Sequence, residues 1–371
     1  MFLNHIHIVN FKNYHDAEIV FSPKINCFTG SNGAGKTNIL DAIYYLSYCK
    51  SYFSSADQQN INHNETFFAV NGVFKDTEAP NNHVSCVLQK GQKKQFSLNK
   101  KEYQRLADHI GKFPLVMISP YDQDLIYNGS DVRRKYFDSV ISQFDSQYLD
   151  ALINYNRALF QRNTLLKMFA ESGRFDKASL DIWDDQLVNY GTDLFHSRQQ
   201  FSDEFIPLLQ RFYQQVSGGR EEVSVDYISQ LQDDDPHDLL VNSVSRDRIL
   251  KYTTTGIHKD DYTFLLDGHQ LKKYGSQGQQ KSFYIATKLA QFEYTTEKKG
   301  FKPLLLLDDI FDKLDKQRVS AIVKLVSEHT FGQVFITDTQ RDRIQDIVTK
   351  LNAEYSLFAV DEAVVSVIAT I

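Results

Sequence analysis

Glycine and proline are scarce in this chain of 371 residues, which contains 17 and 7 of them. Both counts lie below average usage of about 7% and 5%, which excludes collagen-like and low-complexity chains. With 42% hydrophobic and 24% charged residues, the composition is that of a folded protein rather than a disordered one. Five of the few glycines nevertheless fall in two short windows, 30–35 and 275–278. Such clustering indicates backbone conformations that only glycine permits.

Cysteines and long apolar runs are also few or missing. The three cysteines form no CxxC pair, which excludes a disulfide framework and a zinc site of that spacing. No uncharged apolar run approaches the roughly 18 residues of a membrane span, and no signal peptide is visible. These absences predict a soluble, cytoplasmic protein with no membrane partner. The net charge of -6 gives no general reason to expect a polyanionic partner, so a nucleic-acid surface would have to be a local basic patch.

The order of the expected elements divides the chain into three parts, 1–120, 121–220 and 221–371. In the first part we expect strands at 3–9, 16–21, 25–29, within 65–98 and at 114–119, with a helix at 36–46. The second has no proline from 121 to 206 and predicts helices over 131–216, broken near 172–173 and 189–191. In the third we expect strands at 222–227, 262–266, 303–307, 333–336, 355–360 and 363–369, and helices at 277–294, 317–328 and 340–351. This pattern predicts an α/β fold with a mixed sheet and an inserted helical lobe.

The first glycine window matches the P-loop pattern GxxxxGK[ST]. Its residues are Gly30, Ser31, Asn32, Gly33, Ala34, Gly35, Lys36 and Thr37. In such a loop, backbone N–H groups surround the phosphates of ATP, the lysine reaches the β- and γ-phosphates, and the Thr37 hydroxyl holds Mg²⁺. The expected strand before it and helix after it supply the required context. The plain alternative is a glycine turn that enters a helix.

A second candidate follows the leucine-rich strand expected at 303–307. Asp308 and Asp309 come directly after it, as in a Walker B motif. A buried parallel strand delivers its carboxyl end to the P-loop crevice, where Asp308 would bind Mg²⁺ and Asp309 would polarise the attacking water. The alternative is an ordinary buried strand that ends in an acidic turn.

The second glycine window resembles the signature motif of ABC-type ATPases, S-x-G-[GQ]-[QE]. Here Ser276, Gly278 and Gln279 start a helix, and the motif ends 28 residues before Asp308. The resemblance implies that these residues bind the nucleotide of a second subunit, in an ATP-sandwiched homodimer. The alternative is an ordinary helix N-cap. Residues 312–315 stand at the D-loop position, and the switch strand at 333–338 lacks the histidine of transporter ATPases.

Further segments identify the chain as similar to the RecF family of SMC-like ABC-type ATPases. These are 9–14 (VNFKNY), the P-loop with Asn38 after it, 119–129, 133–138, 155–163, 183–184, 256–261 (GIHKDD) and the SQGQQ form of the signature. The resemblance implies ATP and DNA binding, dimerisation on ATP and slow, DNA-stimulated hydrolysis that involves Lys36 and Asp309. It also implies work with RecR and RecO in recombinational repair, loading a recombinase at single-stranded gaps. The alternatives are another ABC-type subunit, SMC-like or transporter-coupled, or a small-molecule kinase.

Several positions depart from the family pattern or stay open. Asp309 departs from most ABC ATPases, which have Glu there, although the resemblance implies that RecF proteins share this Asp; Lys12 stands where many relatives have Arg. Gln123 is a candidate Q-loop residue, and His258 is either structural or functional. Basic clusters that could contact DNA, or simply be solvated, lie at 93–94, 100–101, 133–135, 272–273 and 298–299.

Overall fold

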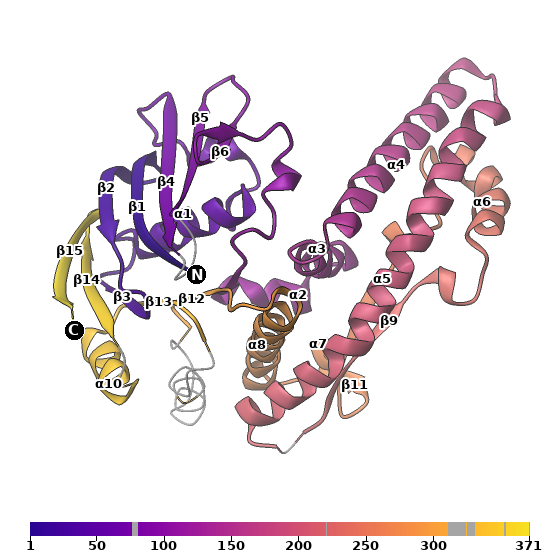
Figure 1. Cartoon of the computed structure of the whole chain (residues 1–371). Coiled ribbons are helices and arrows are strands. Elements are labelled where there is room, and N and C mark those ends of the chain that lie inside the picture. The colour runs from indigo at the N-terminus through magenta and orange to yellow at the C-terminus, as the bar shows by residue number, and fades with distance from the viewer. Residues whose placement is uncertain (76–80, 220, 311–323, 325–330, 352–353, 371) are drawn as a thin grey trace. The chain divides into compact units, whose positions relative to one another are not determined.

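The computed structural model describes residues 1–75, 81–219, 221–310, 324, 331–351 and 354–370. They form two compact units, each built from segments distant in sequence (Figure 1). The first unit comprises residues 1–122, 215–218 and 285–371, and the second comprises residues 123–214 and 219–284. The chain therefore passes between the units several times, and two of the passages fall inside the helices α5 (Lys177–Ser217) and α8 (Gln277–Lys299).

A six-stranded mixed sheet carries the P-loop in the first unit. Its order is β15-β14-β3-β13-β12-β8. The strands are β15 (Val364–Thr370), β14 (Tyr355–Asp361), β3 (Ile25–Thr29), β13 (Val334–Asp338), β12 (Leu304–Asp308) and β8 (Leu115–Ile118). All neighbours are parallel except β15, which runs antiparallel to β14. Strands β3, β13 and β12 are buried on both faces, as parallel strands covered on both sides are.

A second, antiparallel sheet completes the core of the first unit. Its order is β2-β1-β4-β5-β6-β7. The strands are β2 (Tyr14–Val20), β1 (Phe2–Phe11), β4 (Phe67–Lys75), β5 (Asn82–Gln89), β6 (Gln95–Leu98) and β7 (Lys101–Glu102). Helix α1 (Lys36–Tyr48) contributes to one apolar core with residues of both sheets. Because this helix is buried on almost every side, its first turn is held firmly at the end of β3.

Helices dominate the second unit. They are α2 (Asp124–Tyr127), α3 (Ser130–Ile141), α4 (Ser146–Ser172), most of α5, α6 (Pro236–Leu250), α7 (Leu271–Tyr274) and the start of α8. The long helices α4 and α5 lie side by side (Figure 1). A small antiparallel sheet, β11 (His269–Gln270), β10 (Asp261–Leu266) and β9 (Val223–Ile228), belongs to the same unit.

The predicted α/β fold with a mixed sheet and a helical lobe is confirmed, with two differences in detail. Residues 221–284 were expected with the C-terminal ATPase part, but residues 219–284 join the helices, where Tyr262 of β10 packs 4.1 Å from Phe137 of α3 between ring centroids. The break expected at 189–191 is absent, because α5 is continuous and the bare face of Gly191 accepts the Tyr155 ring. The break at Gly173 is confirmed, and its φ of 69° is a left-handed helix cap.

Two expectations fall outside the described residues, namely the D-loop at 312–315 and most of the helix at 317–328. Helix α6 was not predicted from the sequence. Among the described residues, no helix is long and apolar enough to cross a membrane.

Candidate functional site

The P-loop joins β3 to α1, and two of its glycines are required by close contacts. A Cβ on Gly30 would lie 2.1 Å from the carbonyl oxygen of Val360, a backbone atom that cannot move aside. Gly35 has a φ of 116°, and a Cβ there would lie 2.7 Å from Nδ2 of Asn13. The loop therefore packs against β14 on one side and the β1–β2 turn on the other, at distances that a side chain would prevent.

Lys36 is folded back over the loop that precedes it. Its Nζ donates to the carbonyl oxygens of Gly30 at 2.9 Å and Ser31 at 3.0 Å, and the residue is 4% exposed. Both acceptors are neutral, so they hold the ammonium in place without cancelling its charge. A positive charge beside the start of a helix favours anions, and phosphate is an anion that fits this setting.

The two predicted magnesium ligands are in direct contact. The Thr37 hydroxyl donates to Oδ1 of Asp308 at 2.9 Å, and the Thr337 hydroxyl donates to the same oxygen at 2.9 Å. Asp308 is 3% exposed, and burial raises the pKa of its carboxyl to about 6, an effect that the neighbouring Asp309 charge reinforces. A buried carboxylate beside a hydroxyl is a typical oxygen ligand set for Mg²⁺.

Thr337 is the residue of this cluster that was not predicted as part of the site. It lies in β13, between the P-loop strand β3 and the Walker B strand β12. Its oxygen also accepts the backbone N–H of Asp309 at 3.0 Å. Thr337 therefore fixes both consecutive aspartates. A hydroxyl near the end of an otherwise apolar buried strand was the available signal in the sequence.

Asp309 follows β12 in the left-handed conformation, with a φ of 45°. Asp tolerates this region better than most side chains because its carboxylate bonds locally. The backbone turns at this position, directly after Asp308. Only Asp308 is deeply buried.

The remaining predicted P-loop residues line the same turn. Ser31, Asn32 and Gly33 are exposed and Ala34 is buried. Asn38 donates its side-chain amide to Oδ1 of Asn13 at 2.7 Å, and the Tyr14 hydroxyl donates to the carbonyl of Gly35 at 3.1 Å. The segment at 9–14 therefore supports the loop from outside.

The signature residues lie in the second unit, at the start of α8. Ser276 is exposed, and its backbone N–H donates to Oε1 of Gln279 at 2.6 Å. In return the backbone N–H of Gln279 donates to the Ser276 hydroxyl at 3.3 Å. This reciprocal pair is a capping box, so the simple N-cap interpretation is correct as geometry. It leaves the Ser276 hydroxyl proton able to donate to another group.

Proteins of a known family match nearly the whole chain. A family model described as RecF/RecN/SMC N terminal domain matches residues 2–364. The DNA replication and repair protein RecF of Flavobacterium johnsoniae is 49% identical over 358 residues, covering 96% of this chain and 99% of that protein. The chain belongs to the RecF family. The DNA replication and repair protein RecF of Phocaeicola vulgatus is also 49% identical to this chain, over 367 residues that cover 99% of this chain and 98% of that protein.

Solved structures agree with this RecF-family assignment. One described as the recombination mediator protein RecF-ATP in the RecFOR pathway has a TM-score of 0.89 at 28% identity, covering 99% of this chain and 98% of that one. An Smc head domain from Pyrococcus furiosus, with an extended coiled coil, has a TM-score of 0.59 at 16% identity, covering 100% of this chain and 96% of that one. The second likeness concerns the fold alone.

Lys12 forms an ion pair with a fully buried aspartate, while the lysine itself is partly exposed. Its Nζ lies 2.5 Å from Oδ2 of Asp41 in α1 and 5.1 Å from the centroid of the Phe53 ring. Asp41 also accepts the Ser51 hydroxyl at 2.6 Å. The Lys12 ammonium thus links the β1–β2 turn to α1. Its partner Asp41 lies in α1, four residues after the predicted Mg²⁺ ligand Thr37. Gln123, the candidate Q-loop residue, is exposed and belongs to the second unit.

His258, in the family segment GIHKDD, has both ring nitrogens occupied. Nε2 donates to the carbonyl of Thr253 at 3.1 Å, so Nδ1 is the acceptor of the Tyr155 hydroxyl at 2.9 Å. Burial lowers the pKa of the imidazole to about 4. These contacts favour the structural interpretation of His258: a neutral ring that ties the 253–258 loop to α4.

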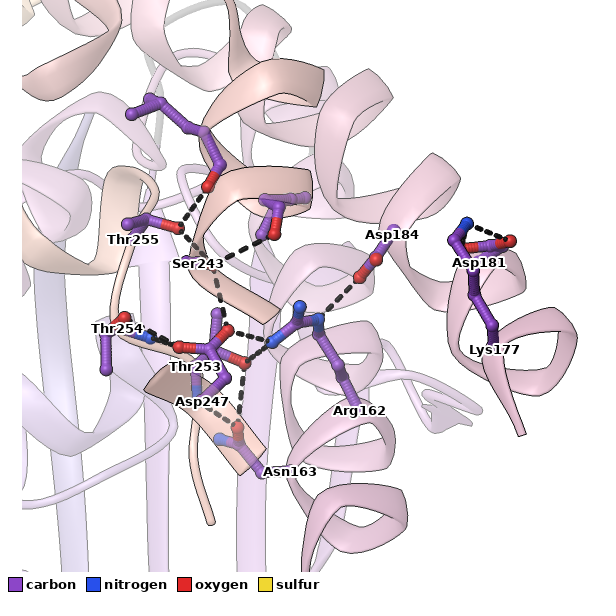
Figure 2. A network of polar contacts seen from close by, with 12 residues as sticks. Arg162, Asn163, Lys177, Asp181, Asp184, Ser243, Asp247, Thr253, Thr254 and Thr255 are labelled. Atoms are coloured by element: carbon purple, nitrogen blue, oxygen red, sulfur yellow. Dashed lines mark hydrogen bonds and ion pairs between the residues drawn. The ribbon is translucent and has the colours of Figure 1, made fainter. Parts of the chain in front are cut away.

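Two further family segments, 155–163 and 183–184, contribute residues to a buried polar network in the second unit (Figure 2). Arg162 of α4 donates to Asp184 of α5 at 2.5 Å and to Asp247 of α6 at 2.6 Å. Its Nη1 also donates to the hydroxyl of Thr253 at 3.0 Å. The network joins three helices and the loop that precedes β10.

The basic clusters are only partly available to a polyanion. Lys94 is bound to Asp57 at 2.6 Å, Arg133 donates through two nitrogens to Asp261, and Arg134 bonds the carbonyl of Asp260. The exposed members are Lys93, Lys100, Lys101, Lys135, Lys272, Lys273 and Lys298. Candidate phosphate contacts therefore remain on both units.

Proposed function

We propose that this protein is an ATP-dependent DNA-binding protein of recombinational repair and replication-gap processing, acting as an ATP-sandwiched homodimer. The observation that carries the proposal is the cluster of Lys36, Thr37, Asp308 and Thr337 in a chain of the RecF family. Relatives named DNA replication and repair protein RecF match it end to end. A structural relative named RecF-ATP supports ATP as the nucleotide.

The residues present fit ATP and Mg²⁺. The loop 30–37, with Asn38, would hold the phosphates, and Lys36 would exchange its two carbonyl partners for phosphate oxygens. Thr37 and Asp308 already converge and would hold the metal. When bound, Mg²⁺ neutralises phosphate charge. Ser276, Gly278 and Gln279 would bind the nucleotide held by a second copy of the chain.

Hydrolysis is proposed to be slow and to serve as a switch. Asp309 is one methylene shorter than the usual Glu, so it would position an attacking water less closely. The hydrogen bond from its backbone N–H to Thr337 holds Asp309 in place, which would limit how closely its carboxylate can approach the attacking water. Slow turnover would let the ATP-bound dimer persist on DNA. Lys36 would support the reaction by stabilising the transferred charge.

DNA, RecR and RecO are the proposed partners. DNA binding is expected to be independent of sequence, because the exposed lysines can contact phosphates and no base-reading module is present in the sequence. RecR and RecO are supported by the family and by the RecFOR description of the structural relatives. They would be the route by which a recombinase is loaded at single-stranded gaps.

Size-exclusion chromatography with light scattering, with and without Mg-ATP and a short gapped duplex, tests this proposal. The wild type should become a dimer with ATP and should bind the gapped duplex about tenfold or more tightly in moderate salt, because dimerisation joins two sets of phosphate contacts. Lys36→Ala should lose both effects. The matched control is Lys24→Ala, which removes an exposed lysine at the other end of β3. DNA affinity that does not respond to ATP in the wild type would contradict the proposal.

A further inference from the structure

The signature helix is connected to a carboxylate that no sequence motif includes. Glu221 lies just before β9 and accepts the side-chain amide of Gln279 through Oε1, with Nε2 at 2.7 Å. The same Gln279 amide accepts the backbone N–H of Ser276 through its own Oε1. The Gln279 amide therefore lies between Glu221 and Ser276, with one end bonded to each.

An ionised carboxylate can only accept hydrogen bonds, and this settles which way the amide faces. If the Gln279 amide were turned over, its oxygen would face the oxygens of Glu221. Its NH₂ group would then face the N–H of Ser276, and neither bond could form. Glu221 thus selects the orientation in which Gln279 completes the capping box. It acts on Ser276 through Gln279 without contacting Ser276 itself.

Glu221 is itself held in place. Its Oε2 accepts the hydroxyl of Tyr213 at 2.7 Å. Tyr213 lies near the end of α5 and is 0% exposed, so it is a fixed donor. The path from a buried tyrosine to Glu221, Gln279 and Ser276 lies entirely within the second unit and consists of hydrogen bonds with matched donors and acceptors.

We propose that Glu221 is a positioning residue of the signature site, which orients Gln279 so that Ser276 meets the nucleotide of a second copy of the chain. This role rests on the ATP-sandwiched dimer of the proposed function. The capping box directs the Ser276 lone pair to the Gln279 N–H, so the hydroxyl proton is free to donate to an anion. Preorganised donors bind an anion more tightly than donors that must first be ordered. The effect of Glu221 should therefore appear in dimer formation and not in nucleotide binding by one copy.

The experiment measures two quantities for the full-length protein. One is the affinity of the monomer for Mg-ATP at low protein concentration, and the other is the ATP-driven dimerisation constant from analytical ultracentrifugation. Glu221→Ala should leave nucleotide affinity within about twofold and weaken dimerisation about tenfold or more, the usual effect of a lost charge-assisted hydrogen bond. Glu221→Gln should recover most of the dimerisation. Its oxygen can accept from Gln279, and its NH₂ can donate to the Tyr213 oxygen.

A matched control is Glu222→Ala, which removes the same charge from the next residue. Glu222 is exposed, and its backbone N–H is what bonds Asp267. This variant should dimerise like the wild type. A Glu221→Ala protein that dimerises normally, or that loses nucleotide affinity and melting temperature along with dimerisation, overturns the positioning role. A wild type that stays monomeric with ATP overturns the sandwich and this role with it.

Discussion

Asp308 is an almost fully buried carboxylate whose two hydrogen bonds come from the hydroxyls of Thr37 and Thr337. Hydroxyls compensate only part of the cost of removing a charge from water. Burial accordingly raises the pKa of this carboxyl. Asp308 therefore carries a charge that its surroundings compensate only in part, and a bound cation would compensate it further.

We predict that Asp308→Asn stabilises the nucleotide-free protein while removing its response to Mg-ATP. Both hydroxyls bond Oδ1, so an asparagine oxygen can keep both contacts. The amide avoids the desolvation of a carboxylate, and the free energy of unfolding should rise by about 1–3 kcal/mol. Urea denaturation without metal measures it. Asp361→Asn, an exposed residue at the end of β14, is the control and should change little. A destabilised Asp308→Asn protein would refute this account of the site.

His258 predicts a pH dependence of stability. Its pKa is lowered to about 4 in the folded protein, against about 6.5 in the unfolded chain. Between these values the unfolded chain binds the proton more tightly, so the free energy of unfolding falls as the pH drops from about 6.5 to about 4. The loss should be on the order of 2–3 kcal/mol. The free energy of unfolding of His258→Gln and of the wild type, compared at each pH, isolates the contribution of His258. Parallel curves for the two proteins would show that His258 is not the group responsible.

Helices α4, α5 and α6 are held together at one level by the buried Arg162 guanidinium (Figure 2). Its partners Asp184 and Asp247 are both buried, so two acidic groups depend on one cation. Burial raises the pKa of Asp184, while the hydrogen bond from Arg162 opposes that shift. The orientation of these helices thus depends on a polar contact as well as on apolar packing.

We predict that Arg162→Met destabilises the protein by about 3–5 kcal/mol, the typical cost of leaving a buried charge without its partner. Thermal or urea unfolding measures the change. The matched control is Lys177→Met on α5, which removes an exposed cation that pairs with Asp181 at 2.7 Å and should leave stability nearly unchanged (Figure 2). Equal losses of stability in the two variants would show that the burial of the Arg162 ion pairs does not set the size of the destabilisation.

At the scale of the whole molecule, the P-loop and the signature lie in different compact units. In a symmetric sandwich, each nucleotide would contact the P-loop of one copy and the signature of the other. Such a site is complete only when two copies meet. Two defective copies can then complement one another if their defects lie in different units.

We predict that Lys36→Ala and Ser276→Arg are each inactive in dimer-dependent ATP hydrolysis but regain activity when mixed. A mixed dimer has one site with both halves intact, so random pairing should restore up to about a quarter of wild-type activity. The double variant, in which both defects are in one chain, is the control and should give no activity when mixed with either single variant. A mixture that stays inactive would contradict a sandwich in which both motifs contribute to one site.

Much of the fold and of the candidate site could be predicted from local pattern. Residues 30–37 and the apolar strand before Asp308 are contiguous in sequence, and each has a backbone or burial requirement that few residue types satisfy. The expected strands at 25–29 and 333–336 and the helix at 36–46 are confirmed nearly to the residue. Helix α6 was missed because its amphipathic pattern is weak and much of it is exposed.

The sequence by itself determined the P-loop at 30–37, because its glycines and the Lys36-Thr37 pair that follows them are contiguous in the chain. Tertiary structure alone decided that Thr337 joins Thr37 at Asp308, that His258 is a neutral, partly buried ring, and that Glu221 reaches Gln279. Each of these contacts joins residues far apart in the chain. Their side chains meet only because sheet order and helix packing bring them together, and no local pattern contains that information.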